Sequence, residues 1–266
     1  MTDTPKATGT EISMHLGDLE EGILVERANR FLALVNLRGR AFEAHVADSG
    51  RLKELLFPGN RVMVRKAGSP NRKTSHDLVL AAFGDIWVCV DTRYPNRLFE
   101  LAAKQGALDA FKEYTSVRRE VTLNQALKRV EGAKGVSAEG VASVEGAPKS
   151  RFDFLLEGPR KPPLLVEVKS VTLCVDGKGL FPDAPTLRGA RHLNEMKQSL
   201  PLGLDGCVVF IAQREDVAQV SANRETDPNF AQAIDRAVQA GVRVHAYRCT
   251  ISDNHIRLQP KEVPYR

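Results

Sequence analysis

The stretch RFDFLLEGPRKPPLLVEVKSV, Arg151–Val171, predicts a β-hairpin. Its first half alternates, so that Phe152, Phe154 and Leu156 share one face of a strand. Its second half, LLVEVKSV, alternates in the same way. Between them, EGPRKPP is rich in glycine and proline, which indicates a loop. The pattern therefore predicts two adjacent antiparallel strands, each with one apolar face.

The polar faces of these strands bring charged side chains together. A hairpin symmetric about Arg160 places Asp153 opposite Glu167, with their Cβ atoms roughly 4.5–5.5 Å apart. Opposed carboxylates repel, and a divalent cation such as Mg²⁺ or Mn²⁺ between them reverses the sign of that interaction. Lys169 shares the face of Glu167, where it can orient a metal-bound water or stabilise charge on an attacked phosphate. We therefore predict Asp153 and Glu167 as metal ligands and, with Lys169, as a catalytic set.

A purely structural interpretation of the same residues is open. Glu167 and Lys169 are also what an amphipathic strand carries on its exposed face. A bulge in either strand would break the register on which the opposition of the two acids depends.

Length and composition bound the class of protein. The 266 residues fit one large domain or two small ones, and 42% hydrophobic with 27% charged residues is typical of globular proteins. The N-terminus lacks the apolar core of a secretory signal, and no apolar run approaches the roughly 18 residues that span a bilayer. We therefore expect a cytoplasmic protein with no membrane partner.

The widely spaced cysteines favour buried thiols over disulfides or zinc: Cys89, Cys174, Cys207 and Cys249.

Charge is distributed unevenly along the chain. From Arg27 to Lys73 there are eleven Lys and Arg against three Asp and Glu, a local excess of +8 in a chain of net charge +5. A basic lobe favours an anionic partner, most commonly nucleic acid, although a solvated basic face is the alternative. The candidate contacts in this lobe are Arg27, Arg30, Arg61, Arg65, Arg72 and Lys73.

The first part of the chain predicts a small β-domain. Residues 1–16 lack periodicity and are expected to be flexible, and residues 17–92 form a run of short strands. About five short strands in some seventy residues fit a small closed barrel of OB type, a fold that binds nucleic acid in a basic groove. The predicted strands are Arg30–Leu37, Phe42–Val46, Arg61–Lys66, Leu78–Phe83 and Ile86–Val90.

Residues 93–266 predict a mixed α/β domain around one sheet. Asn96 is a good N-cap for a helix on which Glu100 lies beside the apolar stripe, close enough to reach a site under the sheet. Residues 126–150 are rich in Gly, Ala, Ser, Glu and Lys and are interpreted as a mobile insertion. The apolar run Gly206–Gln213 predicts a buried strand with Gln213 at its end, where the sites of α/β proteins gather.

Two further helices follow the hairpin. Pro185-Thr186 opens a helix that carries a basic set able to hold a phosphate backbone, namely Arg188, Arg191 and His192. An ordinary basic helix face is the alternative. Asp227 as N-cap and Pro228 at the first position start the last helix.

Several segments together resemble the sugar fermentation stimulation protein (SfsA) family. They are NRFLALV, PGNRV, PNRLFE, RFDFLLE, VEVKSVTL, FPDAPTLRGARHLNEM, FIAQRED and AGVRVHAYRC, spread over nearly the whole chain. The resemblance implies an N-terminal OB-like domain followed by a C-terminal domain of the PD-(D/E)xK nuclease superfamily, and a DNA-binding protein with a regulatory role in sugar metabolism. Here Asp48-Ser49-Gly50 stands where the family has an Asn-Thr-Gly turn, and the 126–150 insertion is a second departure.

The resemblance also implies roles for individual residues. Asp153 and Glu167 match the two acids of the nuclease motif and Lys169 its lysine, while Glu100 matches the helix glutamate that completes the metal ligands and Gln213 a glutamine of a later strand.

Three functional hypotheses remain open on the sequence. The first is a metal-dependent nuclease, the second a DNA-binding regulator that keeps the nuclease fold without cutting, and the third an enzyme acting on a small phosphorylated ligand. No Walker A loop or GxGxxG supports the third. No helix-turn-helix, zinc finger or RNP pattern is present, so we expect phosphate contacts with little sequence preference. The oligomeric state stays open, a homodimer included.

Overall fold

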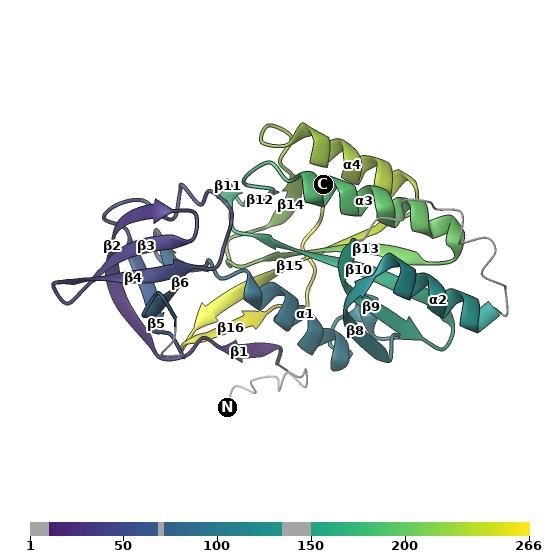
Figure 1. Cartoon of the computed structure of the whole chain (residues 1–266), viewed down its shortest axis with the longest axis horizontal. Coiled ribbons are helices and arrows are strands. Elements are labelled where there is room, and N and C mark those ends of the chain that lie inside the picture. The colour runs from purple at the N-terminus through teal and green to yellow at the C-terminus, as the bar shows by residue number, and fades with distance from the viewer. Residues whose placement is uncertain (1–10, 69–71, 135–149) are drawn as a thin grey trace, which may run out of the picture.

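The computed structural model describes residues 11–68, 72–134 and 150–266. The chain forms two lobes that lie side by side along its longest axis, a barrel lobe and a larger lobe built around a mixed sheet (Figure 1). The predicted order of a small OB-type barrel followed by a mixed α/β domain is confirmed.

The barrel lobe consists of short antiparallel strands that close on themselves. Their order is β4-β3-β2-β5-β6-β7, and β4 also pairs in parallel with β6, which closes the barrel. The longest strand, β2, pairs with both β3 and β5. Its pairing with β3 contains register shifts, at which the strand bends. The bounds are β2 (Leu19–Asn29), β3 (Leu32–Leu37), β4 (Arg40–Val46), β5 (Arg61–Lys66), β6 (His76–Phe83) and β7 (Ile86–Cys89).

The segment before the barrel belongs to the other lobe. Strand β1 (Ser13–His15) pairs with β16 (His255–Leu258), and Ile12 and Leu16 on either side of it are buried. The expected flexibility of residues 1–16 is therefore wrong for residues 11–16, and residues 1–10 lie outside the described ranges. Three residues are too few to show an alternating pattern, and the partner strand lies at the far end of the chain.

The second lobe is organised around a sheet of order β1-β16-β15-β13-β10-β9-β8. Its centre is parallel, because β10 pairs with β13 and β13 with β15 in that sense, and the flanking pairs are antiparallel. The added bounds are β8 (Ser116–Thr122), β9 (Arg151–Gly158), β10 (Lys161–Val171), β13 (Asp205–Ala212) and β15 (Arg243–Ser252). A small second sheet has the order β11-β12-β14, from β11 (Cys174–Val175), β12 (Lys178–Phe181) and β14 (Gln219–Ala222).

Helices cover both faces of the larger sheet. Helix α1 (Arg93–Lys104) packs on one face, and α2 (Leu123–Lys134), α3 (Leu187–Ser199) and α4 (Pro228–Gln239) pack on the other. The 3₁₀ turns η1 (Asp109–Phe111) and η3 (Leu200–Leu202) complete the connections. The predicted starts of α3 and α4 are confirmed, because Thr186 accepts the Gly189 N–H and Asp227 accepts the Phe230 N–H.

Two predictions about the second lobe need correction. Helix α1 begins at Arg93 and not after Asn96, because Asp91 accepts the Arg93 N–H and starts the helix earlier. Helix α2 occupies the first part of the predicted 126–150 insertion, while residues 135–149 of that insertion lie outside the described ranges.

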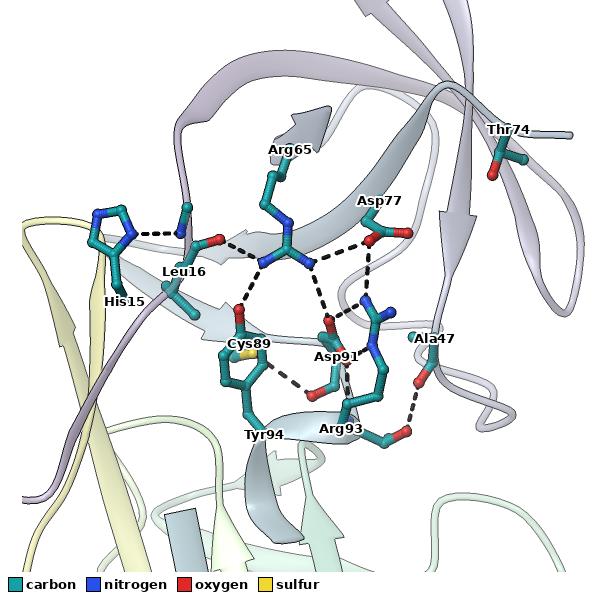
Figure 2. A network of polar contacts seen from close by, with 12 residues as sticks. His15, Leu16, Ala47, Arg65, Thr74, Asp77, Cys89, Asp91, Arg93 and Tyr94 are labelled. Carbon is teal, nitrogen blue, oxygen red and sulfur yellow. Dashed lines mark hydrogen bonds and ion pairs between the residues drawn. The ribbon is translucent and has the colours of Figure 1, made fainter. Parts of the chain in front are cut away.

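A cluster of ion pairs joins the two lobes (Figure 2). Arg65 of β5 donates to the Leu16 carbonyl (2.7 Å), to the Tyr94 hydroxyl (2.8 Å) and to Asp77 of β6 (3.2 Å). Arg93, at the start of α1, bonds to the same Asp77 (3.1 Å). The cluster therefore connects the barrel to the N-terminal segment and to α1 of the other lobe.

Two further contacts fix the lobes to each other. The Cys89 N–H at the end of β7 donates to the Gln213 carbonyl (3.0 Å), and the fully buried Arg214 guanidinium lies 4.3 Å from the ring centroid of Phe83. All four cysteines lie in the described ranges, where they are free thiols and buried, as expected. No helix in the described part of the chain is long and apolar enough to cross a membrane.

Candidate functional site

The hairpin of β9 and β10 has the register that the sequence predicts. Leu164 pairs with Leu156, and Val166 pairs with Phe154, the last pair of the ladder before Asp153 and Glu167. A bulge lies near the turn, before Leu164, and leaves these pairs intact. The Asp153 side chain bonds to the backbone of the neighbouring strand, because its Oδ2 atom accepts the N–H of Val168 (2.8 Å).

The backbone is irregular at this acid. On the other side of β9, the register with β8 places Glu120 beside Asp153, and Glu120 adopts a left-handed conformation (φ 53°). The expectation that Phe152 and Phe154 share a face is wrong, because Phe152 packs on the α3 side of the sheet and Phe154 on the α1 side. Such irregularities commonly redirect a side chain at a functional position.

Asp153 is held by two donors and is nevertheless difficult to ionise. Its Oδ1 atom accepts the Asn96 side-chain amide of α1 (3.0 Å), and its Oδ2 atom accepts the Val168 amide. Burial, and then repulsion by Glu167, raise the pKa of Asp153 to about 6 in spite of these donors and of Lys169.

Glu167 is buried and has one oxygen fully engaged. Lys169 Nζ (2.6 Å) and His192 Nδ1 (2.8 Å) both bond to its Oε1 atom. Burial acts to raise the pKa of Glu167, but the Lys169 charge and the His192 hydrogen bond outweigh it and hold the pKa at about 2. Arg188 Nε donates to His192 Nε2 (3.4 Å), so Nδ1 carries the ring proton and donates it to Glu167.

The second oxygen of Glu167 lacks a partner. Its Oε2 atom is buried and has no hydrogen bond among the residues that the structure describes. An unpaired buried carboxylate oxygen is costly, and repulsion by Glu167 adds to the burial that raises the pKa of Asp153. Carboxylate oxygens are the ligands that Mg²⁺ and similar hard cations take. The two acids therefore fit a divalent cation that completes its shell with water and phosphate oxygens.

Glu100 does not join this pair. It forms ion pairs with Lys104 (2.7 Å) and with Arg119 of β8 (3.1 Å), and in the described ranges no group of three His, Cys, Asp or Glu side chains is placed to hold a metal ion. The third metal ligand implied by the resemblance is therefore not assembled here. The earlier start of α1 gives the position near Asp153 to Asn96, one turn before Glu100.

Gln213 lies at the end of β13, as predicted, and is fully buried. Its side-chain amide donates to Ser170 Oγ (3.0 Å), while its Oε1 atom is buried with no partner in the described part of the chain. Because its carbonyl accepts the Cys89 N–H, Gln213 connects the end of the sheet to the barrel.

A cleft of about 730 Å³ lies between the two lobes beside the acid pair. Asn96 and Lys169 line it, and each bonds to one of the two carboxylates, so the pair lies directly behind the cleft wall. The barrel contributes a basic wall made of Arg27, Arg30, Arg51 and Lys53.

The predicted basic residues of the barrel divide into two groups. Arg30 and Arg27 line the cleft, and Arg27 also bonds to the carbonyls of Arg30, Asp48, Gly50 and Arg51, which shapes this wall. Arg61 pairs with Glu21 (2.6 Å), while Arg65 and Arg72 pair with Asp77. These three arginines are therefore engaged outside the cleft, and Lys73 is exposed and does not line it. Sequence reasoning missed Arg51 and Lys53, because charge counting cannot tell which basic residues face one cleft.

The three predicted phosphate-binding residues on α3, Arg188, Arg191 and His192, also differ in their exposure to solvent. His192 is almost fully buried (1% exposed) against Glu167 and Phe152, so its predicted phosphate contact is corrected to a contact with an acid of the site. Arg188 and Arg191 are exposed, and Arg191 pairs with Glu195 (3.7 Å).

The turn Asp48-Ser49-Gly50 lies in the cleft wall. Burial, and then the nearby Asp183, raise the pKa of Asp48 to about 7, so this acid carries only part of its charge at neutral pH. A Cβ atom on Gly50 would meet the Asp183 carboxylate at 2.3 Å, so a larger residue at this position would displace the Asp183 side chain.

Comparisons with known proteins agree over both lobes. The family model of the SfsA N-terminal OB domain matches residues 25–90, and that of the sugar fermentation stimulation protein RE domain matches residues 125–255. The sugar fermentation stimulation protein homolog of Desulforamulus reducens is 38% identical over 96% of this chain and 95% of its own length. The homolog of Acetivibrio thermocellus is 41% identical over 93% of this chain and 97% of its own length.

A solved structure shows the same fold. The structure of Pyrococcus furiosus SfsA in complex with Ca²⁺ superposes with a TM-score of 0.81 at 24% identity, over 97% of this chain and 99% of that one.

Proposed function

Because this chain belongs to the sugar fermentation stimulation protein family, we propose that it binds DNA in the cleft between its lobes and holds a divalent cation at Asp153 and Glu167. The observation that carries the proposal is the buried Oε2 atom of Glu167, which has no hydrogen bond among the described residues and lies beside a second carboxylate. The basic wall of the barrel lines the same cleft as Asn96 and Lys169, which bond to the two carboxylates.

The metal part of the proposal follows from the charges. Lys169 and His192 both bond to Oε1 of Glu167 and leave Oε2 to a further ligand. A cation there lowers the cost of ionising Asp153, which burial and Glu167 now raise. The Ca²⁺ named for the Pyrococcus furiosus protein is another hard cation that takes oxygen ligands. We propose Mg²⁺ or Mn²⁺ for this chain.

The DNA part of the proposal follows from the cleft. Its barrel wall carries cationic side chains, and Lys169 lines the opposite lobe. Such a surface contacts phosphates and not base edges, so affinity falls steeply with rising salt and depends little on sequence.

Phosphodiester hydrolysis is the reaction that this arrangement supports. A bound divalent cation supplies a Lewis acid for the phosphate and lowers the pKa of a water. The chain does the rest: Asn96 orients Asp153, His192 orients Glu167, and Lys169 presents its ammonium at the cleft wall. The basic wall holds the phosphate backbone beside the acids.

A second candidate is a DNA-binding regulator of sugar metabolism genes that does not cut. The observation that favours it is the position of Glu100, whose carboxylate is occupied by Lys104 and Arg119 and not by the site. A cation held by only two carboxylates of this chain binds less tightly than one held by three.

One experiment separates these functions. Mg²⁺ and Mn²⁺ are titrated into the wild type, Asp153→Asn and the control Glu100→Gln, with metal binding followed by calorimetry and scission of plasmid DNA followed on a gel. Metal binding and cutting that Asp153→Asn loses and Glu100→Gln keeps support the nuclease. Metal binding with no cutting supports the regulator, and no metal binding to the wild type contradicts the metal site.

A further inference from the structure

The cleft is small for nucleic acid. Its volume of about 730 Å³ lies within the roughly 300–1,000 Å³ of pockets that enclose small ligands. A B-form duplex carries two backbones on either side of a major groove that is itself about 12 Å wide. A single strand of a few nucleotides fits such a space, and a duplex remains outside it.

The acid pair lies behind the wall of this cleft. Glu167 is 4% exposed, and the groups that line the cleft in front of the pair are Asn96 and Lys169. A phosphate that enters the cleft therefore comes next to the two groups that bond to the acids. A duplex lying across the mouth of the cleft keeps its phosphates away from the carboxylates.

The lobes are held at a fixed separation. On one side, the cluster of Figure 2 ties Arg65 of the barrel to Leu16 and Tyr94, and Arg93 of α1 to Asp77. Asp77 is 4% exposed, and removing partners from buried ion pairs is strongly unfavourable.

A second connection lies in the cleft itself. The Leu52 N–H of the barrel lobe donates to the Asp183 Oδ2 atom of the other lobe (3.2 Å), and Gly50 packs against the same carboxylate. Widening the cleft enough to admit a duplex would break both connections.

In the barrel, an exposed aromatic residue follows the cleft-lining Asn29 and Arg30 in the chain. This residue, Phe31, is 50% exposed in the turn between β2 and β3. Its N–H donates to Asn29 Oδ1 (2.9 Å), and its carbonyl accepts the Val46 N–H (3.0 Å), so its backbone is fixed. An exposed ring beside an arginine is a platform on which an unpaired base stacks, whereas the bases of a duplex are already stacked on each other.

From the cleft volume, the buried acids, the fixed lobes and the exposed ring, we infer that the cleft takes a single DNA strand, with a base stacked on Phe31 and the backbone between Arg30, Arg51 and Lys169. This inference rests on the proposed function and specifies its substrate class.

The test measures binding without cutting. A fluorescently labelled twelve-nucleotide single strand and the blunt duplex of the same sequence are titrated with the full chain in EDTA at equal salt, and anisotropy is recorded. We expect the single strand to bind at least tenfold more tightly. Phe31→Ala should weaken single-strand binding roughly 5- to 100-fold, the range for loss of one stacked base. The matched control is Phe57→Ala, because Phe57 is 46% exposed on the same barrel and, unlike Phe31, has no chain neighbour that lines the cleft.

The outcomes separate the inference from the proposed function. A duplex that binds as tightly as the single strand overturns the inference and leaves DNA binding intact. A mononucleotide that binds as tightly as the twelve-mer also overturns it, because the cleft is then a small-ligand pocket. If neither DNA binds, the inference and the DNA-binding part of the proposed function both fail, while the metal site is still tested separately by calorimetry.

Discussion

Two clusters in this molecule combine buried acids with cations, and they differ in how completely the charge is balanced. At the lobe junction, Asp77 bonds to Arg65, Arg72 and Arg93, which together hold its pKa well below the usual range although burial acts to raise it. At the hairpin, burial and Glu167 raise the pKa of Asp153 to about 6.

The difference distinguishes a structural cluster from a binding site. At the junction, Arg65, Arg72 and Arg93 pair with Asp77 and Asp91, so the acids are neutralised within the chain and the cluster needs no ligand. At the hairpin, two carboxylates share the single cation Lys169 among the described residues, and one buried oxygen of Glu167 has no partner, so a bound cation would complete the balance of charge. Replacing the aspartate by asparagine should therefore lower the free energy of unfolding at the junction and raise it at the hairpin.

The largest expected effect is at the junction. Asp77→Asn leaves Arg65, Arg72 and Arg93 facing a neutral group, and removing one member of a buried ion pair costs about 3 kcal/mol. We expect the free energy of unfolding in urea to fall by about this amount at pH 8. An unchanged midpoint would show that the arginines are satisfied by solvent and that the junction does not hold the lobes together.

The next effect concerns the orientation of Glu167. His192→Asn retains an N–H donor near the position of Nδ1, whereas His192→Gln places its donor near Nε2 and His192→Leu has none. Loss of such a supporting hydrogen bond typically weakens metal binding roughly 10- to 100-fold. Calorimetry with Mn²⁺ should find near wild-type affinity for Asn and weaker binding for Gln and Leu. Equal affinities in all three variants would remove His192 from the site.

A smaller effect, opposite in sign to that at the junction, is expected for Asp153→Asn without metal. Because the folded-state pKa of Asp153 is raised to about 6, its contribution to stability is fully present below pH 4 and is lost as pH rises through 6. At pH 8 in EDTA, the variant should therefore be more stable than wild type by about 1–2 kcal/mol. The difference should shrink toward pH 5, and a destabilised variant at pH 8 would contradict the account of uncompensated charge.

The smallest effect is expected at Glu100. Its partners Lys104 and Arg119 are about half exposed, and such pairs contribute roughly 0–1 kcal/mol. Glu100→Gln should leave the Mn²⁺ affinity within about twofold of wild type, because the side chain does not reach the acids. A loss comparable to that of Asp153→Asn would mean that Glu100 moves into the site when metal binds.

The hairpin was predictable from sequence because its information is local. Alternation with period two and a short Gly- and Pro-rich loop fix which residues face each other, so the register and the position of Lys169 followed. The α1 residue near the site was not predictable in the same way. Asn96 looks like a helix cap, and only the bond from the Arg93 N–H to Asp91 shows that the helix begins earlier.

Features that depend on distant partners were missed for a physical reason. Strand β1 is ordered by β16, which lies more than two hundred residues later in the chain. The burial of His192 depends on how α3 packs on the sheet, and its spacing from Arg188 is the same whether the pair faces solvent or Glu167. Charge counts located the basic lobe, but the fold decides that Arg51 and Lys53 face the cleft and Arg61 does not.

The most direct test of the account is a calorimetric titration of Mn²⁺ into the wild type and Glu167→Gln. The variant keeps the shape of the side chain but removes the negative charge that Oε2 offers to a cation. We predict a single binding event in the wild type that weakens at least 100-fold in the variant. Equal binding in both proteins, or none in the wild type, would contradict the claim that the opposed carboxylates form a metal site.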